Sequence, residues 1–226
     1  LLGDPYGPAP RFGSCHLLLK PECLAHATFC YGDSAFNPVA KGTRDTLEDI
    51  LSVLLKDSFE NEQVLGRTQV RPPALMQHLL GDLSSLSPAL SDSLAYRNLN
   101  HYIEAQVHAD IHLAEHVESL VVDPSFRDTH TGDALVEVSE TYGITLRWHA
   151  GVQLHASQVP NDYRGGQMRE VARTIAENGQ ISAAAIGRAA IQANLHPKVW
   201  AAFDLPPSQL LKYLWHVLLR FGVPFE

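Results

Sequence analysis

The chain has 226 residues, of which 45% are hydrophobic, which is enough to bury the core of one substantial domain. Its net charge of −8 and the scatter of its 17 Lys and Arg residues argue against a surface that binds nucleic acid by neutralising phosphates. No stretch approaches the roughly 18 to 20 apolar residues of a membrane span, and the chain start does not resemble a signal peptide. We therefore expect a protein without membrane contact, either cytoplasmic or secreted as an effector.

The N-terminal segment, the cysteines and the histidines lead to three further expectations. The chain opens without Met on a Pro- and Gly-rich loop over 1–13, and we expect that an N-terminal portion of a longer protein is missing. Three cysteines, Cys15, Cys23 and Cys30, are an odd number without zinc spacing, which favours reduced thiols over a disulfide framework. The 12 His residues occur without an HExxH or paired CxxC motif, so no metal site is predicted.

The first hundred residues predict short strands followed by a helical insertion. The elements expected here are strands at 14–20 and 28–31 and helices at 43–57 and 72–83. Apolar residues at helical spacing predict the first helix, with Thr43 as its cap. A Ser-rich stretch over 83–93 completes an insertion that spans 42–98.

The middle of the chain holds the residues on which the functional hypotheses depend. A strand expected over 101–109 points its side chains alternately to two faces. One face carries four side chains that can form hydrogen bonds, namely Tyr102, Glu104, Gln106 and His108. This row suits the wall of a cleft, although an ordinary edge strand with a wet face has the same pattern. A second strand over 118–122 is expected to lie more deeply in the sheet and to end before Pro124.

The rest of the chain is predicted to be mainly helical. The remaining elements expected are a helix at 134–143, a strand at 144–150 and helices at 166–179, 181–195 and 206–222. The last helix carries a broad apolar stripe, which we expect to pack on the sheet. Strands interspersed with helices, without regular βαβ alternation, indicate a single α+β domain over 1–226. We expect a mixed or antiparallel sheet with flanking helices and a helical C-terminal part at 165–226.

Several other polar residues are weaker site candidates. Asp33 and Ser34 in a GDS turn could contact a ligand, but both are common turn formers. Asp123 is expected to pair with Arg127 across the loop that follows the second central strand. His108 and His149 both end strands and could face one cleft, although solvent exposure is the commoner explanation for such histidines. A Ser/His/Asp hydrolase lacks the GxSxG elbow that would support it.

Five segments together resemble a bacterial family that is catalogued only as a domain of unknown function. They are PRFGS at 10–14, TFCYGDS at 28–34, YIEAQVHA at 102–109, DPSFRDT at 123–129 and WHAG at 148–151. A second resemblance concerns the chemistry. The run EAQVHADIHLAEHVESLVV is similar to the strand, turn and strand that ADP-ribosyltransferase toxins place around their catalytic glutamate.

The second resemblance implies an enzyme that cleaves the nicotinamide–ribose bond of NAD, as a bacterial toxin or effector with NAD as its substrate. A carboxylate near the ribose stabilises the oxocarbenium charge that develops as this bond breaks. The residues implied are Glu104 as the catalytic carboxylate with Gln106 beside it, and Arg11, Ser14, His16 and Tyr102 as candidates for holding the nucleotide. The acceptor macromolecule and the oligomeric state stay open. The alternative is a non-enzymatic or catalytically inactive interaction domain.

Overall fold

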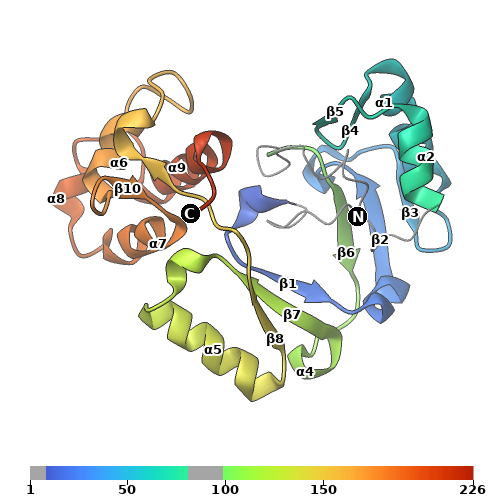
Figure 1. Ribbon diagram of the computed structural model, residues 1–226, viewed down its shortest axis with the longest axis horizontal. Helices are drawn as coiled ribbons and strands as arrows, with labels where there is room; N and C mark the ends of the chain where they lie inside the picture. Colours follow the sequence, from blue (N-terminus) through green and yellow to red (C-terminus); the bar gives the residue numbers. More distant parts are fainter. Residues whose placement is uncertain (1–8, 81–98, 226) are drawn as a thin grey trace.

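The computed structural model describes residues 9–80 and 99–225, and Figure 1 shows three groups of elements in this part of the chain. Two separate three-stranded sheets, each with its own helices, lie beside a helical C-terminal part. The predicted α+β class with small mixed or antiparallel sheets is thereby confirmed. The predicted Ser-rich stretch at 83–93 and the start of the predicted N-terminal loop lie outside the described residues.

The first sheet has the strand order β1-β7-β8. Its strands are β1 (His16–Leu19), β7 (Val117–Val122) and β8 (Thr145–Trp148). β7 pairs antiparallel with β1 and parallel with β8, and it is mostly buried, as the sequence predicts. Helix α5 (His130–Tyr142) contacts β8 and begins four residues before the predicted start, because the Thr129 hydroxyl caps it by accepting from the Gly132 N–H. It ends as predicted at Gly143, which adopts φ +65°.

The second sheet has the order β3-β2-β6 and is antiparallel throughout. Its strands are β2 (Ala27–Tyr31), β3 (Lys41–Thr43) and β6 (Ile103–Val107), and it packs against α1 (Glu48–Glu60) and α2 (Pro72–Leu80). Helix α1 begins later than predicted, because Thr43 belongs to β3 instead of capping the helix. The core below this sheet includes Ile50 and Leu54, as their helical spacing predicts.

The two central strands do not share a sheet. β6 pairs with β2, whereas β7 pairs with β1 and β8, and the short helix α4 (Leu113–His116) lies between them in the chain. The prediction of one sheet for both strands is therefore wrong. Alternation of side chains identifies a strand, but it does not identify the partner strand.

The C-terminal part contains all three predicted helices. They are α6 (Met168–Ile175), α7 (Ala183–Gln192) and α9 (Pro207–Phe221), with the additional short helix α8 (Pro197–Trp200). The predicted stripe of α9 is mostly buried, but it packs against α6 and α7 instead of a sheet. A helix stripe predicts only that an apolar partner exists, and here neighbouring helices provide it.

The remaining elements are short. β4 (Gln63–Val64) and β5 (Arg67–Thr68) form a hairpin, and β9 (Leu154–His155) pairs antiparallel with β10 (Gln180–Ile181), which follows it after α6. The 3-10 turns are η1 (Pro10–Phe12), η2 (Pro21–His26), η3 (Ser34–Phe36), η5 (Pro124–Phe126) and η6 (Ala156–Gln158). The second turn begins at Pro21, a residue that suits the first position of a helical turn.

Candidate functional site

One face of the β3-β2-β6 sheet borders a hollow of about 440 Å³. The antiparallel register places Gln106 opposite Thr28 and Glu104 opposite Cys30, so these side chains share one face of the sheet. The hollow is lined by Thr28, Phe29, Cys30, Ser34, Lys41, Gly42, Thr43 and Gln106. The polar row predicted for the strand at 101–109 therefore lies beside a cavity of ligand size.

Glu104 is held at this hollow by Ser34. Its carboxylate accepts a hydrogen bond from the Ser34 hydroxyl at 2.6 Å and another from the Ser34 backbone N–H at 2.8 Å. These two bonds, with a smaller effect of the Gln106 side chain, lower the pKa of Glu104, while burial and Asp33 oppose them. The carboxylate is thus ionised at neutral pH and fixed next to two residues that line the hollow.

A tight turn after β2 positions Ser34. Gly32 adopts φ +99°, and Asp33 caps η3 by accepting a hydrogen bond from the Ala35 N–H at 2.9 Å. Sequence reasoning misses the role of Ser34, because Asp and Ser are common turn formers. The pairing of β2 with β6, which brings this turn to Glu104, is the signal that would have revealed it.

Tyr102 and Arg11 are near the same turn. Tyr102 is 5% exposed and packs edge-on against Phe12, with ring centroids 5.8 Å apart. Burial and then the Asp33 carboxylate raise the pKa of Tyr102 to about 12, and the charge of Arg11 opposes them. The Tyr102 hydroxyl is buried close to this carboxylate without a well-aligned hydrogen bond. The Arg11 guanidinium donates to Asn100 Oδ1 at 3.2 Å and also lowers the pKa of Asp33.

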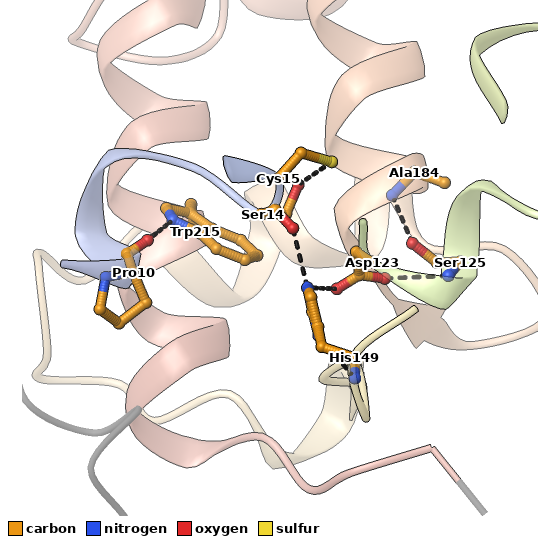
Figure 2. Close-up of polar contacts among 9 residues, drawn as sticks. Pro10, Ser14, Cys15, Asp123, Ser125, His149, Ala184 and Trp215 are labelled. Carbon is orange, nitrogen blue, oxygen red and sulfur yellow. Dashed lines mark hydrogen bonds and ion pairs between the residues drawn. The ribbon is translucent and has the colours of Figure 1, made fainter. Parts of the chain in front are cut away.

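Ser14 lies instead at the first sheet, next to His149 (Figure 2), and His16 is the first residue of β1 in the same sheet. The Gly151 N–H donates to His149 Nδ1 at 2.9 Å, so the imidazole donates from Nε2 to the Ser14 carbonyl oxygen at 2.8 Å. Burial, followed by the nearby His149, lowers the pKa of His16. The structure therefore separates Ser14 and His16 from Glu104, which lies on β6 of the second sheet.

Asp123 completes a strand-end cluster that consists of Ser14, Cys15, Asp123 and His149 (Figure 2). Its fully buried carboxylate accepts from the Ser125 N–H at 2.9 Å and lies 4.0 Å from His149 Nε2. Burial raises the pKa of Asp123, and it also raises the pKa of the Cys15 thiol, which makes that thiol a poor nucleophile. We interpret the strand-end cluster as a structural connection between the ends of β1, β7 and β8.

Two predicted pairings are wrong. His108 Nε2 shares a hydrogen bond with Thr28 Oγ1 at 2.8 Å beside the hollow, whereas His149 belongs to the strand-end cluster, so these histidines do not face one cleft. Arg127 lies over the Trp148 ring at 5.0 Å instead of pairing with the carboxylate at the end of β7. That carboxylate turns inward because it caps η5.

A comparison with protein families assigns the chain. The family model described as a protein of unknown function, DUF3626, matches residues 1–221. The chain belongs to the DUF3626 family. No curated protein and no solved structure matches it. In this DUF3626 protein the matched region contains both sheets and all of α9, so it includes the hollow as well as the strand-end cluster.

The described residues of this DUF3626 protein also bear on metals, thiols and membranes. Within 9–80 and 99–225, no group of three or more His, Cys, Asp or Glu residues is arranged to hold a metal ion. Cys15, Cys23 and Cys30 are free thiols. Among the helices that the structure describes, none is long and apolar enough to cross a membrane.

Proposed function

We propose that this DUF3626 protein is an ADP-ribosyltransferase-like enzyme that cleaves the nicotinamide–ribose bond of NAD, with Glu104 as its catalytic carboxylate. The geometry of Glu104 carries the proposal, because its ionised carboxylate is fixed by two hydrogen bonds from Ser34, and Ser34 and Gln106 line a hollow of about 440 Å³. A carboxylate that is already oriented needs little reorganisation when positive charge develops beside it. Such an activity is typical of a bacterial toxin or effector.

In the proposed reaction, the bond between the nicotinamide nitrogen and the ribose carbon breaks, and its electrons leave with neutral nicotinamide. The ribose gains oxocarbenium character, which Glu104 stabilises through its negative charge. Gln106, two residues further along the same strand face, is placed to bind a ribose hydroxyl. The acceptor nucleophile then bonds to the ribose carbon and releases its proton; a protein side chain, a nucleic acid or water satisfies this chemistry.

The remaining candidates take supporting roles around the hollow. Lys41 lines it and supplies a positive charge suited to the diphosphate of NAD. Arg11 adjoins the turn that carries Ser34 and supplies a positive charge there, whereas the buried Tyr102 hydroxyl can only support this turn. In this proposal Ser34 takes the place of Ser14 and His16, which lie at the other sheet.

The alternative is a non-enzymatic interaction domain, and the loop after Ser34 favours it. In this loop, which connects the lining residues Ser34 and Lys41, the side chain of Phe36 is 83% exposed and that of Val39 is 96% exposed. Exposed apolar side chains that lie close together are typical of surfaces that bind a partner. Such a domain would keep the sheet and bind a macromolecule without turning over NAD.

Incubation with labelled NAD separates the two functions. We expect wild-type protein to consume NAD, and Glu104→Gln to lose about 3 kcal/mol of barrier stabilisation, which is a rate reduced by about two hundred-fold. Glu137→Gln is the matched control, because Glu137 is an exposed residue on α5 and outside the site. NAD should also raise the melting temperature, because a ligand that binds the native state stabilises it.

Each alternative outcome has a definite meaning. Equal turnover by wild type and Glu104→Gln would refute the assignment of the catalytic carboxylate. If NAD does not change the melting temperature of wild type and the protein does not consume labelled NAD, the proposed enzymatic activity is refuted. The interaction domain is then the remaining function.

A further inference from the structure

The last helix and η1 meet at a surface where cationic side chains gather. Trp215 Nε1 donates to the Pro10 carbonyl oxygen at 2.9 Å (Figure 2), so η1 lies against α9. Lys212 and His216 are four residues apart on α9 and therefore share one side of the helix. Arg11 follows Pro10 in η1, and its charge acts on His216.

Arg164 reaches the same surface from the segment that precedes α6. Its guanidinium lies over two aromatic rings, 5.5 Å from the centroid of Tyr163 and 5.6 Å from that of Tyr213. The Tyr213 ring centroid is in turn 6.4 Å from that of His216. Arg164 adopts φ +61°, which is unfavourable for a residue with a side chain. The two rings therefore hold the guanidinium close to α9.

Several nitrogens at this surface lack partners. The Nε atom of Arg164 and both ring nitrogens of His216 are buried without a hydrogen bond, and the Arg11 carbonyl lies near the ring without hydrogen-bond geometry. In the part of the chain that the structure describes, no ion pair involves Arg11, Arg164 or Lys212. Buried polar groups nearly always have partners, so unpartnered ones at a cationic surface indicate a missing ligand.

Three positive charges act on His216 at this surface, and the Asp33 carboxylate lies within electrostatic reach of Arg11. Burial, and then the charges of Arg164, Arg11 and Lys212, lower the pKa of His216 to about 4. The protein as a whole is acidic, with a net charge of −8, so this group of cations differs in sign from the net charge. A bound anion would remove their mutual repulsion and supply acceptors for the unpartnered nitrogens.

We propose that Arg11, Arg164 and Lys212 form a binding site for a phosphate-type anion, with His216 at its base as a further hydrogen-bond donor. A guanidinium presents paired N–H groups that match two phosphate oxygens, and a lysine adds a compact charge. The anion is either free inorganic phosphate or a phosphate group of a nucleotide. This inference does not rest on the proposed reaction, because none of its residues lines the hollow, although Arg11 is a candidate in both places.

Titration calorimetry of the whole chain at constant ionic strength tests this site, with inorganic pyrophosphate and NAD as separate ligands. We expect wild type to bind pyrophosphate and Arg164→Gln to bind it about tenfold more weakly, because a charged hydrogen bond is lost. Lys212→Gln should also weaken binding. Because Lys212 is exposed, this substitution should leave the fold intact. Arg173→Gln removes the same charge from an exposed position on α6 and should leave binding unchanged.

The outcomes separate the site from the proposed enzyme and identify the source of the anion. Pyrophosphate binding that survives Lys41→Gln, which removes the cation proposed to hold the diphosphate in the hollow, supports a site distinct from the hollow. If NAD competes with pyrophosphate for the site, the natural anion is a phosphate group of a nucleotide. If NAD does not compete, the natural anion is free inorganic phosphate. Wild type that binds no pyrophosphate at millimolar concentration would overturn the site. Equal weakening by Arg164→Gln and Arg173→Gln would overturn it too, since general charge attraction would then suffice.

Discussion

His216 makes the stability of this protein depend on pH. Its pKa is about 4 in the folded chain, below the ordinary value of 6.5, because burial and three cations disfavour the charged ring. Between these two values the unfolded chain binds a proton that the folded chain does not, so acid favours unfolding. The stability that depends on the neutral ring is therefore complete above pH 6.5 and is lost as the pH falls toward 4.

The size of this effect follows from the two pKa values. A fall from 6.5 to about 4 is equivalent to about 3 to 4 kcal/mol, at roughly 1.4 kcal/mol for each pKa unit. Solvent screening reduces this figure little, because His216 is only 2% exposed. A loss of this size is a large share of the roughly 5 to 15 kcal/mol by which folded domains are stable.

Urea unfolding followed by circular dichroism at several pH values between 7.5 and 4.5 measures the effect. The comparison is between wild type and His216→Phe, which keeps an aromatic ring but cannot take up a proton. Both proteins share the titration of Glu104 and Asp33, whose lowered pKa values also cost stability in acid, so those contributions cancel in the difference. We expect wild type to lose about 2 to 3 kcal/mol more than the variant. Parallel losses in the two proteins would refute the reasoning.

Two further predictions concern the first sheet and its helices. Gly132→Ala should lower stability by more than about 2 kcal/mol, because the new Cβ would lie 2.0 Å from the Phe126 backbone oxygen. Gly187→Ala, whose Cβ would make only ordinary contacts in α7, should raise stability by about 0.5 to 1 kcal/mol; equal melting temperatures for the two variants would contradict this. Asp123→Ala should cost about 1 to 3 kcal/mol in urea unfolding because it leaves a buried N–H without its acceptor, whereas exposed Asp110→Ala should change little; similar losses would argue against the strand-end cluster.

Local periodicity predicted much of the fold. The helices at 43–57, 166–179, 181–195 and 206–222 were all predicted, because a 3.6-residue repeat of apolar side chains is visible in the sequence alone. The pairing of the strands was not predicted. The residue pattern within β6, or within β7, does not depend on which strand it pairs with. For the same reason the stripe of α9 predicted burial but not the helices that bury it.

The candidate site was predicted in part for a related reason. Alternation along one strand placed Glu104 and Gln106 on one face, and the structure confirms that they share it. Ser34 is 70 residues away in the chain, and only the register of β2 with β6 brings it to the carboxylate. Ser14 and Arg11 are close in sequence, yet they lie at different places because η1 ends at Phe12 and the chain then enters the first sheet.

The three residues of η1 connect parts of the protein that are far apart in the chain. Pro10 accepts the indole hydrogen bond of Trp215 on α9, and Phe12 packs against Tyr102 at the start of β6. A ligand that made one of these contacts more rigid would reduce the entropy lost when the other contact is ordered. Binding at the two places would then be mutually reinforcing, and by reciprocity each ligand would strengthen the affinity for the other by the same factor.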